Sequence, residues 1–540
     1  MCVCGAEDLF LPPEAVNIPM SEETQSVVFF ASSLWGHARA MSAWAARLSA
    51  RAPSISILCF VPSSIYERFH LEFTRQFRTE AEAEVALNSR IKLHKLEIPA
   101  MFPGQATYEA KFREEYNKLC AVNETHPDVV VLDVIMPVAT YDQAHLMAKR
   151  PVKVVCWNPI ALSTMFSHPY RDWIPNMDAV YKKIAEVQKS HDMSFSNAAD
   201  VVYQAELTGK SVNIPGFPRT IDYEGHPQEP PSLRPRAAAI SIHFMENIAS
   251  NDGMICISAY DLETEAFDGV KSLLGAKEVF AAGPLIPDVE APVVHKAELE
   301  QSDDKGIVEF LDRMLTTKGT KSTLYVSFGS IFYPPVPEKL HQIIKVVIEL
   351  GIPLVFVQPK HAPPIPNDIL ATLSSSGIGY VCSWAPQQYI LNHPSVGYFL
   401  THGGLNSTLE ALHVGMPMIN WPQYGDQPFL AILVEQVFEC GYELAEVRRG
   451  HGMHTRGNGT EPEGTLEAVA REAREVLRKA FFDEADRKAK GDAAAALSRK
   501  LRAAWGQDGP ASKALDAFIA FVNRPPPGDR VREARARDLS

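Results

Sequence analysis

Residues 384–427 read WAPQQYILNHPSVGYFLTHGGLNSTLEALHVGMPMINWPQYGDQ. The apolar run Val396–Thr401 predicts a buried strand, the tripeptide HGG a tight turn, and the pattern from Leu405 onward a helix. Glycines in such a turn let the backbone approach a ligand, and the start of the helix offers free N–H groups. The stretch therefore favours a phosphate site at the carboxyl end of a parallel strand.

Two side chains in this helix have an alternative interpretation. Ser407 and Glu410 lie three residues apart, which is also the spacing of a capping box. On spacing alone the capping role is the more common of the two.

Outward from this stretch, short aliphatic runs alternate with helical patterns, which is typical of parallel sheets with crossover helices. The runs in the first half are Val27–Ala31, Ile55–Val61, Ile91–Ile98, Val129–Asp133, Val152–Trp157 and Met254–Ser258. Those in the second half are Leu324–Phe328, Leu354–Gln358, Gly379–Cys382, Val396–Thr401 and Met416–Trp421. The pattern predicts an α/β protein of two Rossmann-like domains that face each other across a deep cleft.

The domain boundaries follow from changes in composition. We expect a first domain over residues 1–282, a Pro-rich and acidic linker over 283–305 and a second domain over 306–504. An apolar stripe predicts a last helix within 505–523, before a flexible tail over 524–540; its members are Leu515, Phe518, Ile519 and Val522. The Gly-, Arg- and His-rich residues 448–464 predict a surface loop.

Size and charge exclude several classes of protein. The chain has 540 residues, 46% of them apolar, which suffices for ordinary cores, and its net charge of −13 disfavours nucleic acid and anionic membranes as partners. We find no secretory signal and no run of about 20 apolar residues that could span a bilayer. The eight scattered cysteines favour reduced core residues over disulfides or a zinc site, so we expect a soluble, cytoplasmic protein without a membrane anchor.

The segments WAPQ, HPSVGYFLTHGG, NSTLE, GMP and DQ occur in order over residues 384–427. In this register the stretch resembles the donor-binding signature of the family 1 glycosyltransferases, which use UDP-sugars and have the GT-B fold. The resemblance implies that Trp384 stacks on uracil, Gln387 reaches the nucleoside and Glu410 accepts the two ribose hydroxyls. It also implies that residues 505–523 cross back to the first domain. The alternative for Trp384 is a place in the core.

The same resemblance assigns the rest of the donor site. It implies that His402, Asn406 and Ser407 bind the diphosphate and that Asp426 and Gln427 hold sugar hydroxyls, although the last two could also belong to a polar loop. In LYVSFGS, the side chains of Ser327 and Ser330 are further diphosphate candidates, or merely turn caps. Leu405 replaces the tryptophan of plant members, so UDP-glucose is the default donor by analogy only.

A candidate base follows the first strand. His37 begins a helix with the apolar stripe Met41, Trp44, Ala45 and Leu48, and a helix start keeps an imidazole neutral and basic. A histidine there is more often a packing or capping residue. The family resemblance makes His37 the general base and Asp133, at the end of a buried run, its orienting partner. Asp128 is the competing partner, and Asp133 could instead cap the next helix.

The acceptor pocket is the least defined part of the prediction. Trp35, Met136, Trp157 and Phe166 follow predicted strand ends together with Trp173 and Phe217, and each could equally be core. Such a lining suits a small hydrophobic acceptor such as a phenolic, polyketide or sterol-like metabolite. The pattern specifies neither the natural acceptor nor an oligomeric state.

The resemblance implies an inverting hexosyl transfer from a UDP-sugar by direct displacement. We expect no cofactor and no metal, because no Asp-x-Asp motif stands in a suitable place. The alternatives are a UDP-sugar epimerase and a non-catalytic protein that binds UDP-sugar and regulates a partner. A nicotinamide dehydrogenase is disfavoured because no G-x-G-x-x-G follows a strand.

Overall fold

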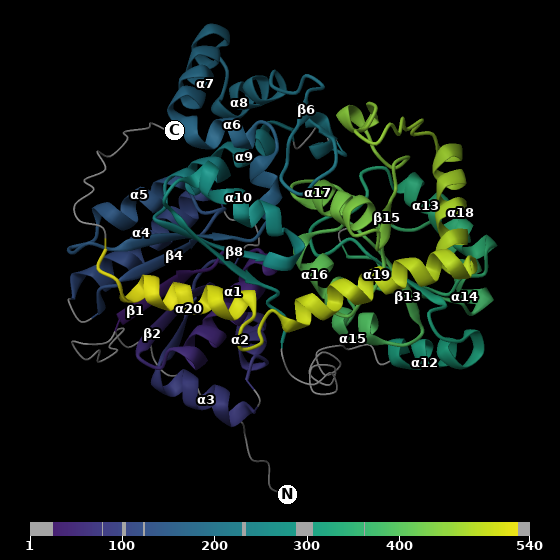
Figure 1. Ribbon diagram of the computed structural model, residues 1–540, viewed down its shortest axis with the longest axis horizontal. Helices are drawn as coiled ribbons and strands as arrows, with labels where there is room; N and C mark the ends of the chain where they lie inside the picture. The colour runs from purple at the N-terminus through teal and green to yellow at the C-terminus, as the bar shows by residue number, and fades with distance from the viewer. Residues whose placement is uncertain are drawn as a thin grey trace, which may run out of the picture.

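The computed structural model describes residues 25–526 except 78, 100–103, 123–124, 229–233, 288–305 and 361. Two parallel sheets form the frame, each flanked by helices (Figure 1). The first has the strand order β3-β2-β1-β4-β5-β8-β9 and the second β12-β11-β10-β13-β14-β15. Both orders reverse next to the first strand of their sheet, which is where α/β proteins bind ligands.

The strands agree closely with the aliphatic runs. Those of the first sheet are β1 (Gln25–Phe30), β2 (Ile55–Pro62), β3 (Ile91–Leu96), β4 (Val129–Asp133), β5 (Lys153–Asn158), β8 (Gly253–Ala259) and β9 (Glu278–Gly283). Those of the second are β10 (Thr323–Ser327), β11 (Leu354–Val357), β12 (Gly379–Cys382), β13 (Val396–Thr401), β14 (Met418–Asn420) and β15 (Gly441–Glu443). A hairpin of β6 (Ser211–Val212) and β7 (Thr220–Ile221) stands apart. The sequence missed β9 and β15, because EVFAAG and GYE hold too few consecutive aliphatic residues to predict a strand.

Helices connect the strands of both sheets. In the first domain they are α1 (Trp35–Arg51), α2 (Tyr66–Thr74), α3 (Glu80–Ser89), α4 (Gln105–Ala121), α5 (Val138–Leu146), α6 (Tyr170–Trp173), α7 (Met177–His191), α8 (Phe195–Gln204), α9 (Arg234–Ala249) and α10 (Thr264–Leu274). In the second they are α12 (Gly306–Lys318), α13 (Pro337–Glu349), α14 (Asn367–Ser376), α15 (Gln387–Asn392), α16 (Leu405–His413), α17 (Gln427–Ile432), α18 (Leu466–Phe482) and α19 (Glu484–Ala503), followed by α20 (Pro510–Asn523).

The first sheet buries both faces, as the continuous aliphatic runs require. On one face of β1, Val27 and Phe29 pack in the same core as Trp44 of α1. On the other face, Val28 and Phe30 pack in the core beneath α4 and α5. Strand β1 pairs in parallel with β4, so the carboxyl ends of the two strands lie side by side. Side chains that follow the two strands can therefore meet there.

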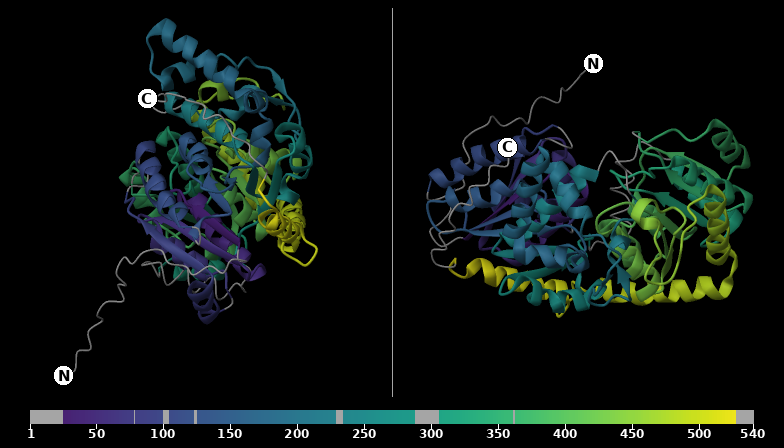
Figure 2. Two further views of the ribbon diagram at one scale, coloured as in Figure 1. Left: turned by 90° about the vertical axis from the view of Figure 1, so that its left-hand side faces the viewer. Right: turned by 90° about the horizontal axis from the view of Figure 1, so that it is seen from above.

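The carboxy-terminal helix returns to the first domain. Figure 2 shows α19 and α20 extending in yellow along both domains. Phe518 of α20 packs between Trp44 and Phe280, with ring centroids 5.8 and 5.3 Å away, and Lys153 Nζ donates 2.6 Å to the carbonyl of Phe521. The helix therefore fastens the end of the second domain to the first.

Candidate active site

His37 and Asp133 meet where β1 and β4 end. His37 Nδ1 lies 3.0 and 3.1 Å from the two carboxylate oxygens of Asp133. Asp133 is fully buried, and it also accepts hydrogen bonds from Ser32 Oγ at 2.8 Å and from the Ile135 amide at 3.1 Å. His37 is 17% exposed. An ionised Asp133 keeps the proton on Nδ1, which leaves Nε2 as the nitrogen that can accept a proton.

Asp128, the competing partner, lies at the other end of β4. Its carboxylate accepts 2.8 Å from the Ser26 amide and lies 3.1 Å from Arg150 Nη2. Asp128 therefore ties strand ends together away from His37.

Two contacts hold the helix start that carries His37. Trp157 Nε1 donates to the His37 carbonyl at 3.2 Å, and Asn406 Nδ2 of α16 donates to the Gly36 carbonyl at 2.8 Å. Asn406, which we expected on the diphosphate, thus bridges the two domains in this structure. The bridge brings the start of α16 to the start of α1.

The expected acceptor lining is mostly core. Trp157 is fully buried, and Met136 and Phe166 pack in the core beneath α4 and α5. The place of these three residues in an acceptor pocket stays a prediction, because large apolar residues at strand ends also seal a domain core. Trp35 is half-buried beneath the Arg68 guanidinium, 4.1 Å above its ring. Trp173 is likewise buried.

His402 directly follows β13 and is buried. Burial lowers its pKa to about 4, so its imidazole is neutral at ordinary pH. A Cβ on Gly404 would come within 2.6 Å of His402 Nε2, and one on Gly329, whose φ is +73°, within 2.8 Å of its ring. The two glycines are needed because the imidazole fills the space between the two turns. Ser327 Oγ accepts from the Gly329 amide at 3.4 Å, and Ser330 is exposed.

The start of α16 has no capping box. Its N-cap is Gly404, and no side chain caps it. Ser407 Oγ instead accepts from Gln387 Nε2 at 3.3 Å, and Glu410 accepts from the same nitrogen at 2.6 Å. The capping interpretation of Ser407 and Glu410 is therefore wrong, and the helix start retains the N–H groups that suit a phosphate.

Trp384 is 43% exposed, which excludes the core interpretation of this side chain. Asp426, by contrast, is buried, and its Oδ2 accepts from the Ala161 amide of the first domain at 2.9 Å. Burial raises the pKa of Asp426 to about 7. Gln427 Oε1 accepts from the amides of Gln423 and Tyr424, at 2.8 and 3.1 Å, and so shapes the loop that carries Asp426.

A small cavity opens beside Asp426, between the domains. Its wall consists largely of hydroxyl groups, two imidazoles and one phenyl ring: Thr164, Ser167, His168, Tyr170, Tyr203, Gly225, His226, Ser241, Tyr424, Gly425 and Phe429. Thr164 Oγ1 is buried without a hydrogen-bond partner, and Ser241 Oγ lies 3.1 Å from the Tyr424 hydroxyl. The free space of this cavity is about that of one water molecule.

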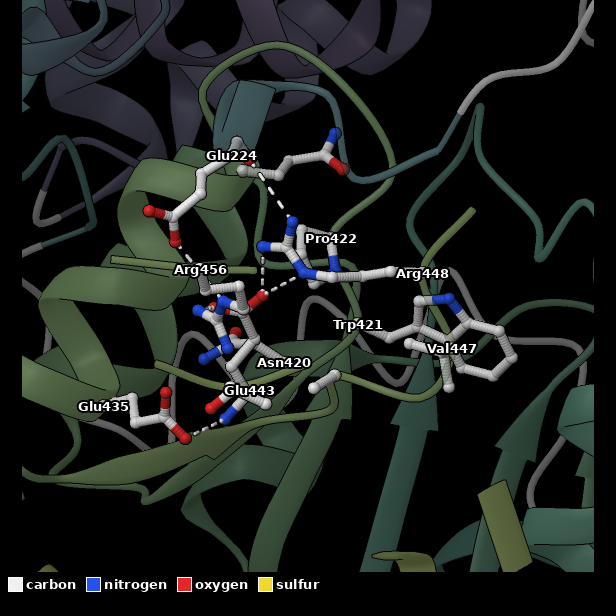
Figure 3. A network of polar contacts seen from close by, with 12 residues as sticks. Glu224, Asn420, Trp421, Pro422, Glu435, Glu443, Val447, Arg448 and Arg456 are labelled. Atoms are coloured by element: carbon white, nitrogen blue, oxygen red, sulfur yellow. Dashed lines mark hydrogen bonds and ion pairs between the residues drawn. The ribbon is translucent and has the colours of Figure 1, made fainter. Parts of the chain in front are cut away.

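Residues 448–464 are not simply a surface loop. Two of their arginines form a buried interdomain cluster, defined here as Glu224, Glu443, Arg448 and Arg456 (Figure 3). Arg448 Nε donates to Glu443 at 3.0 Å, and Arg456 donates to Glu443 at 2.5 Å and to Glu224 of the first domain at 3.3 Å. The prediction failed because Glu224, which helps to bury these arginines, comes from the other domain and is more than 200 residues away in sequence.

In the part of the chain that the structure describes, no helix is long and apolar enough to cross a bilayer. Nor do three or more His, Cys, Asp or Glu side chains of that part gather in a way that could hold a metal ion. No disulfide joins its six cysteines, five of which are buried; Cys2 and Cys4 lie outside the described residues.

Comparison with known proteins gives a consistent result. Residues 284–441 match the family model "UDP-glucoronosyl and UDP-glucosyl transferase". UDP-glycosyltransferase eriJ of Hericium erinaceus is 35% identical over 517 residues, which cover 94% of this chain and all of that protein. The structure of Medicago truncatula UGT71G1 complexed with UDP-glucose aligns with a TM-score of 0.66 at 17% identity, over 92% of this chain and 98% of that one. An anthocyanidin 3-O-glucosyltransferase in complex with UDP gives a TM-score of 0.65 at 18% identity, over 93% and 99%. The chain is therefore a member of the UDP-glycosyltransferase family with the GT-B fold.

Proposed function

We propose that this enzyme transfers glucose from UDP-glucose to a hydroxyl of a small phenolic acceptor, with inversion at the anomeric carbon and without a metal or cofactor. The observation that carries the proposal is the contact of His37 with buried Asp133 at the edge of the domain junction, within electrostatic range of Asp426. This arrangement supplies a base on one side of the junction and a sugar-binding carboxylate on the other.

The mechanism is a single displacement. His37 Nε2 takes the proton of the acceptor hydroxyl as its oxygen attacks the anomeric carbon, and the bond to UDP breaks on the opposite face. Asp133 holds the imidazole in the required tautomer and stabilises the imidazolium that forms. The acceptor oxygen is the nucleophile and attacks the anomeric carbon directly, so no covalent glycosyl-enzyme forms.

Negative charge grows on the diphosphate as UDP leaves. The α16 N-terminus offers backbone N–H groups and the positive end of its dipole, and Ser407 lies in its first turn. His402 is neutral and can donate one N–H to a phosphate oxygen. We assign these groups the charge stabilisation that a divalent cation supplies in other transferases.

Glucose is the proposed sugar because several similar proteins are glucosyltransferases. Indole-3-acetate beta-glucosyltransferase of Zea mays is 30% identical over 53% of this chain, and the Medicago structure holds UDP-glucose. Asp426 and Gln427 are the side chains we assign to the sugar hydroxyls. Leu405 is buried, so it packs α16 and leaves sugar selection to them.

A phenolic acceptor is favoured by the names of similar proteins. Flavonoid 3-O-glucosyltransferase of Medicago truncatula is 40% identical over 26% of this chain, and Gallate 1-beta-glucosyltransferase of Quercus robur is 31% identical over 36% of it. Flavonoids and gallate are phenols, whereas sterols are not.

The test is UDP release by the purified full-length chain with UDP-glucose and a panel of phenols and sterols, in the presence of EDTA. We expect release that depends on a phenol, and a β-glucoside by NMR of the product. Release that requires a divalent cation, or an α-glucoside, would contradict the proposal.

A control without acceptor separates the alternatives. A UDP-sugar epimerase would produce a new UDP-sugar in that control, and a non-catalytic binder would bind UDP and turn over nothing with any acceptor.

A further inference from the structure

Five polar side chains form a closed ring across the domain junction. Arg39 Nη1 donates to Glu410 Oε1, and Arg39 Nε lies 3.5 Å from Glu72. Arg75 donates to Glu72 at 2.9 Å and to Gln388 Oε1 at 3.0 Å, and Gln388 Nε2 closes the ring on Glu410 Oε1 at 3.3 Å. We call Arg39, Glu72, Arg75, Gln388 and Glu410 the polar ring. Three of its members come from the first domain and two from the second.

The polar ring is largely shielded from water. The side chains of Glu72 and Glu410 are 3% and 4% exposed, and that of Arg39 is 13% exposed. A buried carboxylate requires a cation and well-placed donors, because the cost of removing it from water is otherwise not offset. Arg39 supplies that cation to both carboxylates at once, from a helix position only two residues after His37.

The ring also decides which oxygen of Glu410 remains for a ligand. A carboxylate offers about four acceptor positions. Arg39 and Gln388 both bond to Oε1, whereas Oε2 accepts only from Gln387 among the contacts described. The positions left on Oε2 are therefore the ones that a vicinal diol can use.

We propose that Arg39 of the first domain is a positioning residue for the ribose of the donor nucleotide, which it orients by fixing the Glu410 carboxylate in the second domain. The inference rests on the proposed function in that it takes a uridine diphosphate as the ligand of Glu410. Nucleotide affinity then depends on the first domain, although the donor motif lies in the second.

The test compares two nucleotides in one set of variants. We would measure by calorimetry the binding of UDP and of 2′,3′-dideoxyuridine diphosphate, which lacks the diol, to wild type and Arg39→Met. We expect Arg39→Met to weaken UDP about tenfold, or about 1.4 kcal/mol, and to weaken the dideoxy nucleotide less than twofold. Arg51→Met serves as the matched control, because Arg51 lies on the same helix and pairs with Asp516 at the surface; both nucleotides should bind it as they bind wild type.

Each outcome of this experiment supports or overturns the proposed role of Arg39. Unchanged UDP affinity in Arg39→Met would overturn the proposal, and so would equal weakening of both nucleotides, which would indicate a general effect on domain contact. If Arg39→Met does not fold, Arg39→Gln takes its place, and a UDP affinity within twofold of wild type would again overturn it. Wild type that binds no UDP would instead refute the proposed function itself, whereas UDP binding without turnover would leave the role of Arg39 supported by the binding data.

Discussion

The two sides of the domain junction use histidine in opposite ways. His37 of the first domain is partly exposed and pairs with a buried carboxylate. His402 of the second is buried, faces Phe332 with ring centroids 5.8 Å apart, and has its pKa lowered to about 4. In the proposed mechanism the first takes up a proton, and the second remains neutral while it donates a hydrogen bond.

The difference extends to how each side is assembled. Most of the second-domain site comes from residues 384–427, whereas the first-domain pair joins residues nearly 100 positions apart. We infer that proton transfer can be disrupted without loss of donor binding, since the His37 and Asp133 side chains make no described hydrogen bond to the residues assigned to the nucleotide. The variants below test that separation.

The largest expected effect is on the base. His37→Ala should lower kcat about 10³-fold, because general-base catalysis is lost, while UDP affinity stays within twofold of wild type. Steady-state kinetics and calorimetry measure the two quantities. His191→Ala, an exposed histidine at the end of α7, is the control. An equal loss of UDP affinity in His37→Ala would break the separation of the two sides.

The next effect concerns the junction itself. Arg448→Met removes one cation from the fully buried interdomain cluster, which we expect to cost about 3 kcal/mol in the free energy of unfolding. Urea denaturation measures it. Arg171→Met, which breaks an exposed pair with Asp172, should cost less than about 1 kcal/mol. Equal costs for the two variants would mean that the buried cluster stabilises the chain no more than an exposed ion pair does.

The pH dependence of stability tests the carboxylate between the sides. Burial raises the folded-state pKa of Asp426 to about 7, so the folded chain holds a proton that the unfolded chain has released. The stability from this group is complete below the unfolded pKa and is lost as pH rises through about 7. Relative to wild type, Asp426→Asn should gain about 2 kcal/mol in the free energy of unfolding between pH 5 and pH 7. A difference between the two proteins that does not change with pH would contradict the raised pKa.

The candidate donor site of the second domain could be proposed from sequence, because its residues occur in a fixed order around one strand–turn–helix unit. The proposed catalytic pair required more: His37 and Asp133 were predicted from strand ends and resemblance, and adjacent parallel strands do bring them together. Local physics also misled, since the spacing of Ser407 and Glu410 matches a capping box that is absent.

The interdomain contacts were not predictable. Arg39 and Arg456 look like solvated charges in sequence, and their partners Glu410 and Glu224 belong to the opposite domain. Trp157 shows the converse: a large apolar residue at a strand end contacts the candidate site through one indole hydrogen bond to the His37 backbone.

The smallest expected effect sharpens the comparison on the second-domain side. Trp384→Ala should weaken UDP about tenfold, because a base that stacks on an aromatic ring gains about 1–3 kcal/mol, while kcat at saturating donor stays within twofold. The free energy of unfolding should change by less than about 0.5 kcal/mol, since the indole is 43% exposed. Phe482→Ala, another exposed aromatic, is the control and should alter neither quantity. A large fall in kcat in Trp384→Ala would show that the ring orients the sugar for reaction as well as binding the base, so that donor binding and proton transfer would no longer be separable.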